Sequence, residues 1–199
     1  MRTQIRLEIT SIAPQDATEA NHIADALAWI DSGAELFRLA KPATPAKHLV
    51  AYFAVVDEGN ILLVDHKNAQ LWLPAGGHVE PLEHPRNTVV REMREELGFA
   101  PAHEILAPLM VTCSTTVGLT AGHVDVSLWY VVHAPREQKI SFDETEFNTV
   151  EWFALAQVPL HRSDPHLGRF IAKLNSIQLP QAGRSLMRPS GQVRSSPPV

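Results

Sequence analysis

The segment from Gly77 to Phe99 constrains this chain more than any other part of it, because it carries a dense run of charge where a helix is expected. Glu92, Glu95 and Glu96 fall at positions i, i+3 and i+4 of that run. Carboxylates at this spacing share one face of a helix and repel one another. A divalent cation that takes oxygen ligands would relieve the repulsion. The pattern therefore predicts a metal-binding helix face, although a solvated charge run is the ordinary alternative.

The other side of the same helix is apolar, with Val89, Val90, Met93 and Leu97 at helical spacing. Such a stripe can bury against a sheet. We expect the helix to run from Pro85 to Leu97, because proline suits the first helical position and Gly98 suits the end. His84, just before the proline, would cap the helix less well than Ser, Thr or Asp.

The glycines and charges around this helix stand at defined offsets, which are Gly77, then Glu83, Arg91-Glu92, Glu95-Glu96 and Gly98. This spacing resembles the complete signature of the Nudix hydrolases, which cleave nucleoside diphosphates linked to a further group. The flanks are similar too, in the run Leu71 to Gly77 and in Glu151-Trp152-Phe153, so the resemblance spans roughly His48 to Ile177. Pro81-Leu82 departs from it, because members commonly carry glycine in the turn just before the glutamate that is Glu83 here.

The resemblance implies a metal-dependent phosphoanhydride hydrolase. Glu92, Glu95 and Glu96, with the backbone carbonyl of Gly76, would hold Mg²⁺, or Mn²⁺ as an alternative. Metal ions so placed neutralise phosphate charge and lower the pKa of a bound water. Arg91 is expected to orient a carboxylate, with Glu83 as its first candidate.

A further acidic residue is expected just before the closing strand, where Asp143, Glu144 and Glu146 precede Trp152. Glu146 is our first choice as a general base or an additional metal ligand. A simple solvated loop explains these residues equally well.

Residues that could contact a substrate are harder to select from sequence. His78 lies inside the glycine loop, and alternation places His123 and Asp125 on one face of a strand from Gly122 to His133. We expect these three side chains to bind substrate, although an exposed sheet face would produce the same pattern. The ten histidines show no compact metal-binding spacing, which argues against a zinc site. Trp72, Phe53 and Cys113 are expected in the core rather than in a site.

The first 47 residues form an extension outside the resemblance. Alternation over Arg2 to Ile12 favours a strand, with Ile5, Leu7 and Ile9 on one side. Asp16 with Glu19 is a capping-box pattern, and it predicts a helix that ends near Gly33. The apolar stripe of this helix consists of Ala20, Ile23, Ala24, Leu27 and Ile30. The stripe must pack on its own core or on a partner, and we hypothesise a homodimer with Ile23, Leu27 and Ile30 in or near the interface.

The remaining elements are read from periodicity and turn residues. Strands are expected at residues 48–57, 60–66, 105–117, 122–133 and 149–153, and a last helix after Asp164-Pro165 with a stripe formed by Leu167, Phe170, Ile171, Leu174 and Ile177. These elements predict an α+β protein built as a three-layer α/β/α sandwich, and the family resemblance implies a mixed sheet. The expected organisation is an extension at 1–47, a Nudix hydrolase domain at 48–179 and a disordered tail at 180–199.

Composition limits the partners. A net charge of −5 gives no basic face for nucleic acid, and no apolar run is long enough to cross a membrane. A single cysteine and the lack of a signal-peptide pattern favour the cytoplasm. We expect a small-molecule nucleotide substrate. Two other functions on the same fold stay open, which are a non-catalytic nucleotide-binding regulator and an isomerase of allylic diphosphates.

Overall fold

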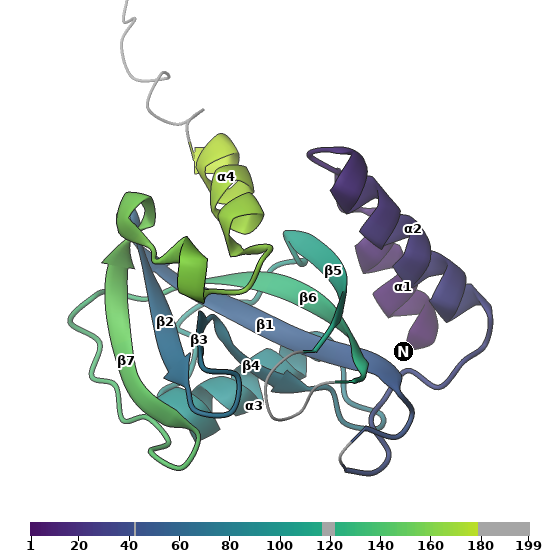
Figure 1. The fold of residues 1–199 in the computed structure, drawn as a ribbon, viewed down its shortest axis with the longest axis horizontal. Coiled ribbons are helices and arrows are strands. Elements are labelled where there is room, and N and C mark those ends of the chain that lie inside the picture. Colours follow the sequence, from purple (N-terminus) through teal and green to yellow (C-terminus); the bar gives the residue numbers. More distant parts are fainter. Residues whose placement is uncertain (42, 117–121, 179–199) are drawn as a thin grey trace, which may run out of the picture.

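The computed structural model describes residues 1–41, 43–116 and 122–178, and these residues are organised around one mixed sheet (Figure 1). Five strands run in the order β3-β2-β1-β6-β5, while β4 pairs with β1 and β7 pairs with β2. Only the β1–β6 pair is parallel among the pairings of the described strands. The strand bounds are β1 Lys47–Asp57, β2 Asn60–His66, β3 Leu71–Leu73, β4 Ala75–His78, β5 Met110–Thr115, β6 Val124–His133 and β7 Phe147–Ala154.

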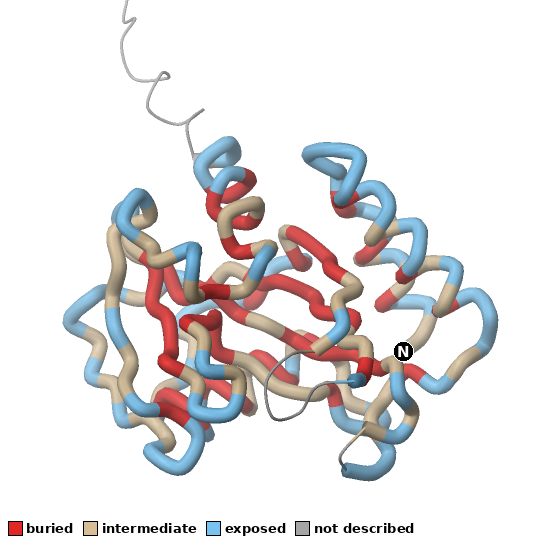
Figure 2. Tube along the Cα trace, in the orientation of Figure 1, coloured by how far each residue is buried: buried red, intermediate tan, exposed pale blue. Residues whose placement is uncertain are grey.

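Two helices cover opposite faces of this sheet. Helix α3 (Pro85–Leu97) packs beneath β1 residues such as Phe53, while α4 (Leu167–Gln178) packs over the intervening residues such as Ala54. Figure 2 shows buried residues along the strands between these helices. The structure therefore confirms the α+β sandwich with a mixed sheet, because alternate residues of β1 belong to two separate apolar layers.

The start of the chain was predicted as a strand, and this prediction was wrong. Residues Arg2–Thr10 form helix α1, in which Ile5 and Ile9 are fully buried whereas Leu7 is 60% exposed. Ile5, Ile9 and Ile12 are spaced i, i+4 and i+7, which is a helical period. Ile5, Leu7 and Ile9 fit the alternation of a strand, and Ile5, Ile9 and Ile12 fit the period of a helix. In so short a segment the sequence therefore allows both interpretations.

Helix α2 (Ala17–Asp31) begins as its capping box predicts, because the Asp16 side chain accepts a hydrogen bond from the Glu19 amide. Its predicted stripe is only partly correct. Ala20 and Ala24 are exposed, whereas Ala26 and Ile30 are buried in the core that includes α1. The apolar face of α2 is covered by other residues of the same chain. This helix therefore does not need a second copy to bury it, and the homodimer stays a prediction.

Helix α2 also covers the edge strand β5. The backbone N–H of Cys113 donates to His22 Nδ1 at 3.1 Å, so a side chain from the extension satisfies an edge donor. Pairing an edge in this way protects a sheet from association with other strands. The buried side chain of Glu19 accepts an ion-pair hydrogen bond from Lys173 of α4. The extension is thereby attached to the sheet edge and to α4.

The other boundaries are close to those expected, with two exceptions. Strand β5 begins at Met110 rather than Ile105, and Pro108 explains the shortening because proline cannot donate to a ladder. Val117, at its predicted end, lies outside the described residues. In α4, Ile177 is 52% exposed, so the buried stripe ends before it. The tail at 180–199 also lies outside the described residues.

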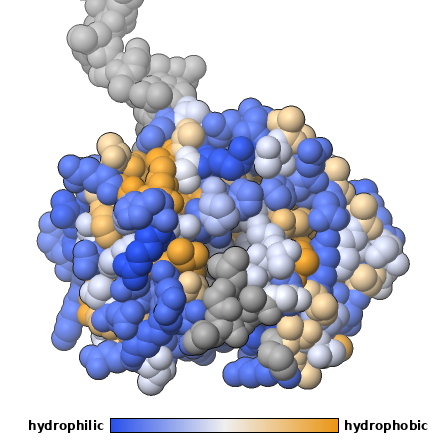
Figure 3. All heavy atoms as spheres, viewed as in Figure 1, coloured by the Kyte–Doolittle hydropathy of each residue, from blue (hydrophilic) through white to orange (hydrophobic). Residues whose placement is uncertain are grey.

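The outer surface of α4 carries an apolar patch, visible in Figure 3 between this helix and the short turn η2 (Leu155–Gln157). Leu155, Ile171 and Ala172 are among the residues that line it. No helix in the described part of the chain is long and apolar enough to span a membrane.

The buried ion pair between the extension and α4 generates a stability prediction. Lys173→Met should lower the free energy of unfolding by about 3 kcal/mol, because Glu19 would keep a buried charge without its partner. Urea unfolding followed by circular dichroism measures the change. Arg169→Met, which removes a solvent-exposed pair with Asp16, is the matched control and should have little effect. The double variant Glu19→Gln/Lys173→Met should recover most of the loss, and a double variant no better than Lys173→Met would contradict the assignment.

Candidate functional site

Helix α3 has the predicted bounds, and both ends have a physical cause. The His84 side chain accepts a hydrogen bond from the Arg86 N–H at 3.2 Å, so a histidine caps this helix after all. Gly98 ends it in the left-handed conformation at φ 74°, and a Cβ there would lie 2.8 Å from the Ser141 carbonyl oxygen. The charged face of the helix is thereby fixed in register against the loop that precedes it.

That loop contains the departure from the family pattern. Leu82 adopts φ 66°, a left-handed conformation that glycine adopts without strain. Its side chain is 86% exposed, so no packing compensates for the strain. The turn is thus kept with leucine in the place of glycine, at a cost of about 1–2 kcal/mol, and Glu83 still reaches the helix.

Arg91 forms hydrogen bonds with most of the charged groups around it. Its guanidinium donates to both carboxylate oxygens of Glu83, at 3.1 and 3.0 Å, and to the His78 carbonyl at 3.2 Å. One nitrogen also bonds Glu92 at 2.7 Å and Glu95 at 3.2 Å. Arg91 therefore joins the loop carboxylate, strand β4 and two carboxylates of the charged face. This geometry agrees with an orienting role.

Glu92 and Glu96 are buried between α3 and β4, where two glycines make room. A Cβ on Gly77 would lie 1.9 Å from Glu92 Oε1, so any side chain there would displace this carboxylate. The Gly76 N–H donates to Glu96 Oε2 at 2.9 Å. Gly76 itself has φ 150°, and a Cβ on it would lie 2.2 Å from the Ala51 carbonyl oxygen. Gly77 is required by close approach, and Gly76 is required both by close approach and by its positive φ.

The two buried carboxylates are electrostatically unfavourable without a cation. Burial, and then the charge of Glu92, raises the pKa of Glu96 to about 9. Burial also raises the pKa of Glu92, although Arg91 opposes the shift. In Glu83 burial is outweighed by hydrogen bonds from Arg91 and Thr88, which lower its pKa. A positive charge beside Glu92 and Glu96 would reverse the raised values.

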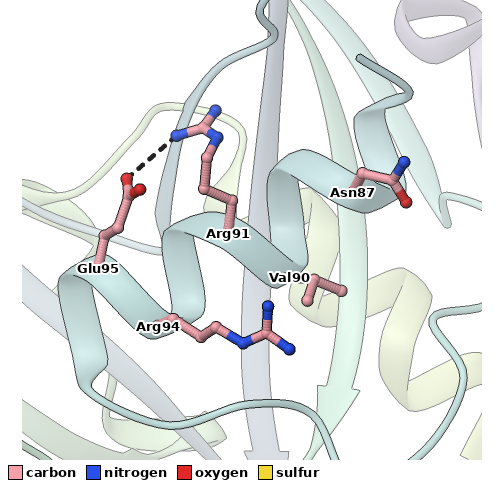
Figure 4. A pocket seen from close by; sticks show the side chains of 5 residues that line it. All are labelled: Asn87, Val90, Arg91, Arg94 and Glu95. Atoms are coloured by element: carbon pink, nitrogen blue, oxygen red, sulfur yellow. Dashed lines mark hydrogen bonds and ion pairs between the residues drawn. The ribbon is translucent and has the colours of Figure 1, made fainter.

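Glu95 lies outside this buried pair, with a side chain that is 60% exposed. Together with Asn87, Val90, Arg91 and Arg94 it lines an open groove of about 440 Å³ along α3. Figure 4 shows the bond between Arg91 and Glu95, with Arg94 on the neighbouring turn. The groove therefore places two arginines beside the charged face, and arginine is well suited to contact phosphate.

The structure also brings Glu146 close to the site. Its charge contributes to the raised pKa values of both Glu92 and Glu96. Asp143 acts on Glu96 as well, but its carboxylate is engaged by Thr145 through the backbone N–H and the hydroxyl. Glu146 is exposed, so of the two it is better placed to contact solvent and substrate.

The three predicted substrate-binding residues are brought together elsewhere. His78, His123 and Asp125 lie on the face of the sheet opposite α3, and His48 joins them. Burial, and then the charge of Arg38, lowers the pKa of His78 to about 3, and burial raises that of Asp125 to about 7. Sequence reasoning missed His48 because it lies inside an apolar strand segment, where only its polarity distinguishes it.

The other candidates are structural. Phe53 is fully buried, and Trp72 packs edge-on against Phe153 at 4.9 Å. Cys113 lies against α2, and burial raises the pKa of its thiol to about 12. A thiol in that environment is a poor proton donor or nucleophile at neutral pH, so the isomerase alternative gains no support from it.

The residues of the charged face fit a hard divalent cation by chemistry. They offer carboxylate oxygens, two of them buried, and a glycine cradle that keeps Glu92 in place. In this structure, however, the carboxylate oxygens of Glu92, Glu95 and Glu96 do not converge on one common point. Within the described residues, the His/Cys/Asp/Glu group whose ligand atoms lie within 4.8 Å of one another is His48, His78, His123 and Asp125.

The raised pKa of Glu96 predicts how stability depends on pH. Its folded pKa of about 9 exceeds the ordinary 4.5, so its contribution to stability is present below pH 4.5 and is lost as pH rises toward 9. With a chelator present, Glu96→Gln should therefore melt higher than the wild-type chain at pH 8, and the difference should shrink toward pH 5. Thermal melts across this range measure it, with exposed Glu95→Gln as the control. If Tm plotted against pH gave parallel curves for Glu96→Gln and wild type, the raised pKa of Glu96 would be contradicted.

Comparison with known proteins identifies the fold and the family. Residues 47–174 match the NUDIX domain family. The search of the curated proteins finds no match. Among solved structures, a MutT NUDIX hydrolase from Burkholderia pseudomallei is 26% identical, with a TM-score of 0.56, and the alignment covers 64% of this chain and 98% of that one.

Two more distant structures share the fold. The NUDIX domain of Shewanella oneidensis NrtR, solved with ADP ribose, has a TM-score of 0.52 at 20% identity, over 65% of this chain and 87% of that one. A C. elegans Ap4A hydrolase has a TM-score of 0.52 at 15% identity, over 66% and 98%. With the matched region covering more than half of its length, the chain belongs to the NUDIX family and is a hydrolase of acid anhydrides in phosphorus-containing substrates.

Proposed function

We propose that this chain hydrolyses a phosphoanhydride bond in a nucleoside di- or triphosphate derivative with the help of Mg²⁺ or Mn²⁺. The observation that carries the proposal is the buried pair Glu92 and Glu96, held between α3 and β4 by Gly76 and Gly77. Two like charges out of water are unfavourable unless a cation joins them. A protein that only needed a stable helix would gain nothing from this arrangement.

Glu92, Glu95, Glu96 and the Gly76 carbonyl would hold the metal ions. When bound, such ions neutralise phosphate oxygens and make a water more acidic. Arg91, anchored by Glu83, keeps Glu92 and Glu95 oriented toward the same side of α3.

Arg94 lines the groove. Its guanidinium makes no hydrogen bond or ion pair with another of the described residues, so it can contact a phosphate oxygen. Glu146 is our candidate for the base that removes a proton from the attacking water, since it is exposed and its charge reaches both buried glutamates.

The substrate class is inferred from the relatives. One similar structure is named a MutT hydrolase, a second was solved with ADP ribose, and a third is named an Ap4A hydrolase. The last two names each contain a nucleoside phosphate joined to a further group. Nucleotide sanitising, and hydrolysis of a nucleotide sugar or ADP-ribose, are the two main possibilities. His78, His123 and Asp125 were predicted to contact such a substrate, but they lie on the face of the sheet opposite α3, so their part in substrate binding remains a prediction. Assignment to the cytoplasm and formation of a homodimer also remain proposals.

The first prediction of this proposal concerns the charged face. Glu92→Gln and Glu96→Gln should each lower turnover at least about 100-fold, because a metal ligand charge is lost, while the fold stays intact. Glu95→Gln should also lose most of its activity. The measurement is release of phosphate or pyrophosphate from nucleoside triphosphates, ADP-ribose and dinucleoside polyphosphates with Mg²⁺. Glu151→Gln, at an exposed position of β7, is the matched control.

Two outcomes would contradict the proposal. Wild-type turnover in the glutamine variants, or in the absence of any divalent cation, would remove the metal assignment. No turnover of any phosphoanhydride by a folded wild-type chain would favour the non-catalytic nucleotide-binding regulator instead.

The second prediction tests the glycine cradle. Gly77→Ala should fold and melt close to wild type, because its Cβ meets the movable end of the Glu92 side chain rather than backbone. Its activity should nevertheless fall at least about tenfold, since the carboxylate would be displaced. Gly168→Ala, whose Cβ would lie 3.3 Å from Leu160, is the control and should keep full activity. Equal activities of the two variants would show that the position of Glu92 does not matter.

A further inference from the structure

We propose that His48, His78, His123 and Asp125 form a second metal site, which binds a zinc-like transition-metal ion and is separate from the glutamates of α3. Three of the residues lie on strands β1, β4 and β6, which meet at one end of the sheet, and His123 comes directly before β6. Parallel pairing of β1 with β6 places His48 opposite Asp125, and antiparallel pairing of β1 with β4 places His78 opposite Val50. Since residues two apart share a face, His48, His78 and Asp125 project to the same side.

This side is opposite the charged face of α3. Gly77 faces Glu92, and His78, the next residue along β4, points the other way. The sheet itself therefore separates the four residues from Glu92 and Glu96. A metal ion bound by the histidines would not share ligands with the hydrolytic centre.

The distances suit a tetrahedral ion. One ligand atom from each of the four residues lies within 4.8 Å of the others. Asp125 Oδ1 is 3.4 Å from His48 Nε2 and 3.3 Å from His123 Nε2. Zinc bound at about 2.0–2.1 Å by tetrahedral ligands separates them by about 3.3–3.4 Å. Two edges of the tetrahedron are therefore already in place, and the others require only a contraction.

Hydrogen bonds on the second ring nitrogen fix the side that two of the histidines, His48 and His123, present. His48 Nδ1 lies 2.8 Å from the Pro45 carbonyl, which can only accept, so Nδ1 carries the hydrogen and the neutral ring has a lone pair on Nε2. His123 Nδ1 lies 3.1 Å from the Thr116 hydroxyl oxygen, whose own hydrogen is directed to the His123 carbonyl. Metal-binding histidines are usually held by such a bond on the second nitrogen.

Two polar atoms at the centre of the cluster have no hydrogen-bond partner. His48 is fully buried, and neither its Nε2 nor Asp125 Oδ1 makes a hydrogen bond, although they lie 3.4 Å apart. A lone pair that faces a carboxylate oxygen is repulsive, and a cation between the two would make the contact favourable. Three imidazoles and one carboxylate suit zinc rather than Mg²⁺, which prefers oxygen ligands. Four protein ligands leave no open position, as in structural zinc sites.

Arg38 is the nearest competing cation. Its guanidinium donates to His78 Nε2 at 3.2 Å, and this side chain would have to turn away when the metal binds. Replacing Arg38 by Met should therefore tighten zinc binding about tenfold, because a fixed positive charge beside the site is removed. The change should have the opposite sign to that of every ligand variant.

The test uses the full chain after treatment with EDTA and gel filtration. Titration with Zn²⁺ against a chromophoric chelator should show one ion per chain, and His78→Gln and Asp125→Asn should each weaken binding at least about 100-fold. His103→Gln, an exposed histidine outside the cluster, and Glu96→Gln should bind as wild type does. Zn²⁺ at about 100 times Kd should raise the Tm of wild type by roughly 5–10 °C, and Co²⁺ should give a tetrahedral visible spectrum that the two ligand variants lack.

Each outcome of the zinc titration decides for or against this site. A wild-type chain that binds no zinc overturns the proposal whether or not the variants fold. Equal zinc binding by wild type, His78→Gln and Asp125→Asn also overturns it, as does loss of zinc in Glu96→Gln. If His78→Gln and Asp125→Asn raise KM for a nucleotide without any zinc being bound by wild type, the residues contact substrate instead. Loss of hydrolysis by the glutamate variants of α3 is independent of all these results.

Discussion

The close approach of helix α3 to strand β4 is the contact on which the rest of the site depends. Gly77 leaves room for the Glu92 carboxylate, and the Gly76 N–H holds Glu96 from the strand side. Arg91 completes the junction by bonding the β4 carbonyl of His78 and the carboxylate of Glu83. The bonds to Glu96 and Glu83 each stabilise a negative charge that burial opposes. The helix is therefore held against the sheet by the same groups that prepare its charged face for a cation.

Strand β4 separates two kinds of chemistry because successive residues of a strand point to opposite faces. The glycine side faces the carboxylates of α3, and on the other side His78 lies with His48 of β1 and with His123 and Asp125 at the start of β6. The proposed hydrolytic centre and the proposed zinc site are thus neighbours in sequence and separated by the sheet. A metal on the histidine side would link β1, β4 and the start of β6 through side chains.

The N-terminal helices show how an extension becomes part of a domain. Helix α1 contributes Ile5 and Ile9 to the core that α3 also enters, and α2 covers the edge strand β5. The buried pair Glu19–Lys173 then links α2 to α4. An edge strand without such a cover would expose unpaired donors and acceptors. Residues outside the family's core thereby protect its sheet.

The sequence by itself determined the helix from Pro85 to Leu97, the two strands at 48–57 and 60–66 and the charged face of α3. These features depend on local spacing, which survives without any knowledge of long-range contacts. It could not decide whether Arg2 to Ile12 is a helix or a strand, because alternation and helical period coincide over a short segment. It could not join His48 to His78 and His123 either. Residues so far apart in the chain meet only through the β1–β4 and β1–β6 registers, and strand pairing is a property of the tertiary structure.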